Sequence, residues 1–103
     1  MSYNVNFSDL ARKDLDNIAD YYIFDLKSPD IALSKIQMLR QAISSLTTMP
    51  ERHGLVDDAY LAAQGYRKFP IGKYIVFYIL DVECHSVWIS RIVYERRQWQ
   101  DLL

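Results

Sequence analysis

The sequence is poor in cysteine, glycine and proline, with one, three and three of them among 103 residues. A single cysteine cannot form an internal disulfide, so we expect a cytoplasmic protein held together by its hydrophobic core. So little glycine and proline excludes collagen-like, low-complexity and disordered chains. No apolar run approaches the roughly 20 residues that cross a bilayer, so we expect neither a signal segment nor a membrane span.

The composition that remains is that of a globular domain. Half of the residues are hydrophobic and 14% are aromatic. A chain of this length has room for one core, so residues 1–103 are predicted to form a single domain. Residues 1–66 carry six basic and nine acidic side chains, whereas residues 67–103 carry six basic and four acidic ones. The C-terminal third, with a net charge of +2, therefore suits an acidic protein or a phosphate backbone, or is simply a solvated surface.

Hydrophobic spacing predicts a strand and two helices in the first part of the chain. Residues 3–7 alternate apolar and polar side chains with a period of two, which is typical of a half-buried strand. Ser8 is a good N-cap for a helix of four or five turns, because apolar residues then recur at spacings of three and four. Pro29 starts a second helix, which ends before Pro50. Since the linker is short, the two helices should pack as an antiparallel hairpin.

The rest of the chain predicts a loop, three strands and a last helix. Residues 51–65 lack periodicity and hold at most one helical turn. Three segments are rich in β-branched and aromatic residues and are separated by turns: 66–69, 74–80 and 86–94. Residues 95–103 are predicted to form a terminal helix. The fold class is therefore α+β, with an N-terminal strand, a helical hairpin, a three-stranded antiparallel meander and a C-terminal helix, and with one sheet face partly open.

Several chemical signatures are missing from the sequence. It contains no GxxxxGK[ST] phosphate loop, no GxGxxG turn and no GxSxG nucleophile motif. His53 lies in a different segment from Cys84 and His85, and the three lack a paired-ligand spacing. We therefore expect no metal site and no cofactor.

Two stretches carry a family resemblance. Residues 66–78 read YRKFPIGKYIVFY, and residues 87–97 read VWISRIVYERR. Their order and spacing resemble the RelE/ParE superfamily of bacterial type II toxins, which show an arginine-bearing strand, a Y-x-V-x-Y strand and an I-x-R-[IV]-x-[HY]-x-R-R ending. LARKDL at residues 10–15 and LTTMP at residues 46–50 also occur in the family's order. The resemblance therefore covers essentially the whole chain.

This resemblance implies a growth-inhibiting toxin, of the kind associated with plasmid stabilization, that a cognate antitoxin neutralises in a hetero-oligomer. The superfamily divides by target. RelE-like members cut messenger RNA on the ribosome, using basic groups to hold the phosphate and a Tyr, His or Glu to assist attack by the 2′-hydroxyl. ParE-like members are not enzymes and instead bind and poison DNA gyrase.

Carried onto this sequence, the resemblance favours the gyrase inhibitor and keeps the ribonuclease as the alternative. The candidate catalytic residues of a ribonuclease are Arg67, Arg91, Tyr94 and Arg96. Ile75 stands where ribonuclease relatives commonly have an arginine, and a neutral side chain cannot stabilise a developing phosphorane charge. The ending of the last strand looks more like the gyrase branch, although Tyr94 replaces the histidine often found there.

The candidate target-binding residues come from the C-terminal third: Arg67, Lys68, Lys73, Arg96, Arg97 and Trp99. The same basic residues would also keep an exposed sheet edge soluble. Arg91, placed within a strand, needs an acidic or hydrogen-bonding partner, so a structural ion pair and a functional contact both stay open. Trp99 is expected to close over the sheet or to anchor a partner.

Overall fold

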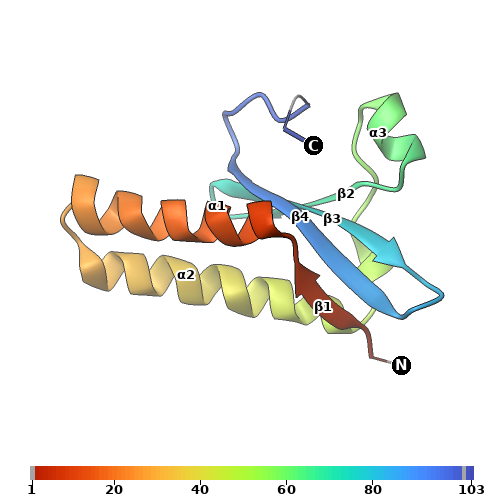
Figure 1. The fold of residues 1–103 in the computed structure, drawn as a ribbon, viewed down its shortest axis with the longest axis horizontal. Coiled ribbons are helices and arrows are strands. Elements are labelled where there is room, and N and C mark those ends of the chain that lie inside the picture. The colour runs from red at the N-terminus through yellow and green to blue at the C-terminus, as the bar shows by residue number, and fades with distance from the viewer. Residues whose placement is uncertain (1, 101) are drawn as a thin grey trace.

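In the computed structural model, which describes residues 2–100 and 102–103, a helical hairpin packs on a four-stranded sheet (Figure 1). The elements are β1 (Asn4–Phe7), α1 (Asp9–Asp20), α2 (Pro29–Ser44), α3 (Ala59–Ala63), β2 (Arg67–Ile71), β3 (Tyr74–Asp81) and β4 (Ser86–Tyr94). A π-helical turn, η1 (Tyr21–Asp25), extends α1, and two 3₁₀ turns, η2 (Ser45–Thr47) and η3 (Pro50–Arg52), follow α2. The predicted α+β class is confirmed, and the hairpin's far end projects beyond the sheet (Figure 1).

The sheet has the strand order β1-β4-β3-β2. β2, β3 and β4 form the predicted antiparallel meander, and β1 pairs with β4 in parallel. Pro70 is tolerated in β2 because that strand lies at an edge, where a missing N–H need not interrupt a ladder. The register between β3 and β4 shifts at Phe77 and Tyr78, where β4 carries Ser90 as an extra residue.

Local signals explain where the helices begin. The Ser8 hydroxyl accepts the amide of Ala11 at 3.0 Å, so Ser8 is the N-cap that the sequence predicts for α1. Ser28 occupies the N-cap position of α2, but its hydroxyl donates to the carbonyl of Leu26 instead of capping the helix. Pro29 follows at the first helical position, where its missing N–H leaves no hydrogen bond unmade.

Alternation along β3 divides the core between the two sheet faces. Val76 and Tyr78 pack with the hairpin, whose buried stripe includes Leu15 and Leu39. Phe77 points to the opposite face. There it packs with a second group of residues from the α3 region, β4 and the C-terminal tail: Val56, Leu61, Val93, Trp99, Leu102 and Leu103. This second face is thus partly covered, although Trp88 stays 48% exposed.

The predicted helix over residues 95–103 is wrong, because turns and irregular backbone occupy the described residues of that segment. Tertiary contacts hold the segment instead: the Trp99 ring lies 4.9 Å from that of Phe77, and Arg91 donates to the carbonyl of Leu102 at 3.1 Å. A helix of nine residues forms too few hydrogen bonds to offset the free-energy cost of its nucleation. The conformation of this segment is therefore set by its tertiary contacts. The tail closes over the sheet through Trp99. None of the described helices has the length and apolar character needed to cross a membrane.

Candidate binding site

Arg91 lies on the part of β4 that extends beyond its pairing with β1. β4 continues beyond β1, and α1 supplies the missing hydrogen-bond partners: Ser8 donates to the carbonyl of Ser90 at 2.7 Å, and Asp14 accepts the amide of Ile92 at 2.9 Å. The same carboxylate binds Arg91 through Nε at 2.8 Å and Nη2 at 3.0 Å. The hydrogen bonds that Arg91 donates to Asp14 raise the pKa of Arg91. Arg91 therefore makes a structural ion pair.

Two other predicted basic residues, Arg67 and Lys68, have polar partners within the chain. Arg67 donates to the carbonyls of Glu51 at 3.2 Å and His53 at 2.7 Å, which ties β2 to the loop after α2. Lys68 lies 3.4 Å from the carboxylate of Asp57, whose side chain is 89% exposed. A pair that is so open to solvent contributes little to stability. Arg67 thus positions a loop, whereas Lys68 belongs to the solvated surface.

A cavity of about 740 Å³ lies between the hairpin and the C-terminal end of β4. Four tyrosines, drawn from η1, β3 and β4, line it: Tyr21, Tyr22, Tyr74 and Tyr94. Three cations also line it, from α2, the β2–β3 turn and the segment after β4: Lys35, Lys73 and Arg97. We call these seven residues the tyrosine groove. The groove brings together side chains that lie far apart in the sequence.

The tyrosines of the groove contact one another. The hydroxyls of Tyr22 and Tyr74 lie 3.3 Å apart, and the Tyr94 ring stands edge-on to Tyr74 with centroids 6.0 Å apart. Burial, followed by the hydrogen bond with Tyr22, raises the pKa of Tyr74 well above its usual range. Tyr74 therefore stays a neutral hydroxyl, and the lining carboxylate, Asp14, is already bound to Arg91. The cations leave the groove with a positive character that suits an acidic partner.

Three predicted site residues, Lys73, Tyr94 and Arg97, meet in this groove. Arg96 is exposed beside it but does not line it. The other predicted residues lie elsewhere: Arg67, Lys68, Arg91 and Trp99. Sequence reasoning missed Lys35 because it lies on α2, far from the basic C-terminal third. The adjacent tyrosines Tyr21 and Tyr22, at the end of the first helix, are a sequence feature that could have indicated that side of the groove.

No described group of three or more His, Cys, Asp or Glu side chains could hold a metal ion. His53 stacks on Phe69 with ring centroids 3.8 Å apart, and its buried Nε2 has no hydrogen-bond partner among the described residues. Burial and the nearby charge of Arg52 lower the pKa of His53. The histidine is thus held neutral within the packing of the loop.

Comparison with known proteins adds to this geometry. The sequence profile of the ParE toxin of the type II toxin-antitoxin system parDE matches residues 5–99. A search of curated protein sequences finds no significant match.

Among solved structures, the chromosomal ParDE toxin–antitoxin system from Pseudomonas aeruginosa matches with a TM-score of 0.75 and 20% identity, over 90% of this chain and 96% of that one. The RelBE2 toxin–antitoxin complex from Mycobacterium tuberculosis matches with a TM-score of 0.63 and 23% identity, over 91% and 92%. The archaeal RelE–RelB complex from Pyrococcus horikoshii OT3 matches with a TM-score of 0.59 and 13% identity, over 94% and 99%.

Proposed function

This chain belongs to the ParE toxin family of type II toxin–antitoxin systems, and from that membership we propose that it inhibits DNA gyrase by binding it through the tyrosine groove. The chain is the toxin component, and an antitoxin is its partner. Gyrase as the target, the groove as the contact surface and the cytoplasm as the compartment are the parts that we propose.

The observation that carries the proposal is the dispersal of the candidate ribonuclease residues. Arg91 lies on β4 and is bound to Asp14, whereas Arg67 lies on β2, across β3, and is bound to loop carbonyls. Tyr94 lines the groove, whereas neither arginine is among the residues that line it. Cleavage of RNA needs cations that converge on one phosphate beside a proton-transfer group. None of the three candidate arginines, Arg67, Arg91 and Arg96, lines the groove beside Tyr94, which favours binding over catalysis.

The exposed side chains of the groove suit a protein partner. Tyr21 is 48% exposed and Tyr94 is 42% exposed, and Leu26, which also lines the groove, is 48% exposed. Tyrosines supply a large apolar area together with a hydroxyl, and they are enriched at the centres of protein interfaces. The surrounding cations would attract an acidic partner surface and accelerate association.

The proposal is tested by reversing two groove charges together, Lys73→Glu and Arg97→Glu, in a gyrase supercoiling assay. We expect the concentration needed for half inhibition to rise at least about tenfold. The matched control reverses Arg12 and Lys13, which are exposed on α1 outside the groove, and should inhibit like the wild type. If wild type and groove variant inhibit equally, the groove is not the contact surface. If wild type leaves gyrase unaffected, the gyrase assignment is wrong.

A further inference from the structure

The far end of the helical hairpin exposes apolar side chains. We call residues 20–33 the hairpin tip, and its exposed large apolar residues are Tyr21, Phe24, Leu26, Ile31 and Leu33. Phe24 is the most open of them, at 68%. Because the hairpin projects beyond the sheet (Figure 1), the sheet leaves much of this apolar surface uncovered. Exposed apolar groups of this kind are typical of surfaces that bind another protein.

Main-chain hydrogen bonds hold the hairpin tip in one shape. The amide of Leu26 donates to the carbonyl of Tyr21 at 3.1 Å, and the amide of Ser28 donates to the carbonyl of Tyr22 at 2.8 Å. Lys27 lies between these two bonds with a φ of +51°, a left-handed conformation that ends the helical turn. A surface that is already ordered in this way loses little conformational entropy when it binds.

The hairpin tip and the sheet end of the tyrosine groove carry opposite charges. The exposed charged residues of the tip have a net charge of −2: Asp20, Asp25, Asp30 and Lys27. The exposed charged residues at the sheet end have a net charge of +2: Lys73, Arg96, Arg97 and Glu95. None of these eight side chains forms an ion pair with another described residue. Both surfaces therefore have charge that a partner could match.

The hairpin tip and these cations lie at opposite ends of one surface. Tyr21 and Leu26 belong to the tip and line the tyrosine groove, whereas Lys73 and Arg97 reach the groove from the sheet. A two-fold axis across the middle of the groove would place the acidic tip of one copy against the basic sheet end of the other. The reciprocal contact would form at the same time. The surface is therefore complementary in charge to a second copy of itself.

We propose that two copies of this chain associate so that the hairpin tip of each copy packs into the tyrosine groove of the other. Phe24 packs against Tyr94 of the other copy, a ring that is 42% exposed. The carboxylates of Asp20 and Asp25 pair with the basic sheet end of the other copy. This dimer hides both grooves, so a second copy and gyrase compete for the same surface. Only that competition rests on the proposed function.

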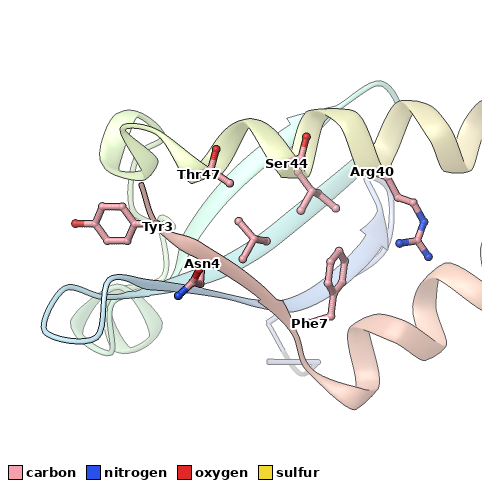
Figure 2. Close-up of a pocket in the computed structure, with 8 residues that line it drawn as sticks. Tyr3, Asn4, Phe7, Arg40, Ser44 and Thr47 are labelled. Carbon is pink, nitrogen blue, oxygen red and sulfur yellow. The ribbon is translucent and has the colours of Figure 1, made fainter. Parts of the chain in front are cut away.

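A second cavity, of about 420 Å³ between β1 and α2, suits the hairpin tip less well (Figure 2). Arg40 is the one charged side chain among the residues that line it. A single cation does not match a tip with a net charge of −2. The cavity also lies toward the C-terminal end of α2, whereas the tip contains the N-terminal end of that helix. The tip and this cavity therefore do not form one continuous surface.

Sedimentation equilibrium of the purified toxin, with reversed charges, tests the proposal. We expect the wild type to show a monomer–dimer equilibrium. Asp20→Lys with Asp25→Lys reverses the tip, Lys73→Glu with Arg97→Glu reverses the groove, and each double variant alone should associate at least about tenfold more weakly. An equimolar mixture of the two variants should associate as tightly as the wild type, because each tip then meets a groove of opposite charge.

Two further variants separate this contact from a general effect of charge. Glu51→Lys with Glu83→Lys changes the net charge as the tip reversal does, at exposed positions outside the tip and the groove, and should associate like the wild type. Phe24→Ala keeps every charge and should weaken association severalfold.

Two results would overturn the proposal. One is a wild type that stays monomeric up to about 0.1 mM. The other is a mixture of the tip and groove variants that associates no more tightly than either variant alone. These measurements contain no gyrase, so failure of gyrase inhibition leaves them unchanged. A monomeric toxin that inhibits gyrase overturns this inference alone.

Discussion

Asp14 binds Arg91 through two hydrogen bonds of 2.8 and 3.0 Å, although 77 residues separate them in the sequence. The same carboxylate accepts the amide of Ile92, so α1 replaces a neighbouring strand along the free edge of β4. Arg91 in turn donates to the carbonyl of Leu102. One carboxylate thus fixes the helical hairpin, the last strand and the C-terminal tail relative to one another.

Removing this carboxylate should destabilise the fold. Asp14→Ala leaves a largely buried guanidinium and a strand amide without partners, so we expect the free energy of unfolding to fall by about 2 to 3 kcal/mol. Asp16→Ala, at an exposed position on the same helix, should change it by less than about 0.5 kcal/mol. Urea denaturation measures both. Equal midpoints for the two variants would show that the Asp14 contacts contribute nothing net.

The two tryptophans should differ in their effect on stability. Trp99 is half-buried against Phe77, so Trp99→Ala should lower the free energy of unfolding by about 2 kcal/mol. Trp88 is 48% exposed, and Trp88→Ala should cost less than about 1 kcal/mol. Thermal and chemical denaturation of both variants check this order. The reverse order would mean that the tail does not hold the second sheet face.

Arg96 and Arg97 carry the same charge at adjacent positions. Comparing their alanine variants therefore separates a role in the groove from the loss of one positive charge. Both are exposed, but only Arg97 lines the tyrosine groove. We expect Arg97→Ala to weaken growth inhibition severalfold and Arg96→Ala to leave it nearly unchanged, with both melting midpoints close to the wild type. Controlled expression in a sensitive host measures toxicity. Loss of folding in either variant would assign these arginines a structural role.

His53 should make the fold sensitive to acid. Its pKa is lowered in the folded state, so the neutral form is favoured there. Its contribution to stability is therefore complete above the unfolded pKa of about 6.5 and is lost as the pH falls below that value toward the lowered folded pKa. His53→Phe keeps a ring against Phe69 and should make the urea midpoint change less with pH between about pH 7.5 and 5. His85→Asn is the control for the removal of an imidazole. If the urea midpoint of His53→Phe changes with pH as steeply as that of the wild type, this account is contradicted.

The elements of the fold that depend on local patterns could be predicted from the sequence. The Ser8 cap, the apolar stripe of α1 and the β-branched run of β3 each carry their signal within a few neighbouring residues. The terminal segment could not be predicted, because Trp99 and Leu102 have a helical spacing that tertiary packing overrides. The choice between helix and turn depends on Phe77 and Arg91, which lie outside the segment.

The candidate site could be predicted only in part. Lys73 and Arg97 could be predicted because they belong to the basic C-terminal third, and Tyr94 because the family resemblance marks its position. Lys35 joins them only after the hairpin folds onto the sheet. Arg67 resembles a free cation in the sequence, since nothing there shows that the carbonyls of Glu51 and His53 surround it. A pattern of residue types identifies which side chains carry charge, but their partners are set by the tertiary structure.

The most direct test of the central claim measures gyrase supercoiling and message cleavage side by side with purified wild-type protein and Tyr94→Phe. We predict that the wild type inhibits supercoiling and leaves ribosome-bound message intact. Tyr94→Phe keeps the ring in the groove, so its inhibition should fall by less than about threefold. Loss of a proton-transfer group typically lowers a rate by about a hundredfold or more. Codon-positioned cleavage of message that collapses in Tyr94→Phe, with gyrase unaffected, would contradict the account and identify a ribonuclease.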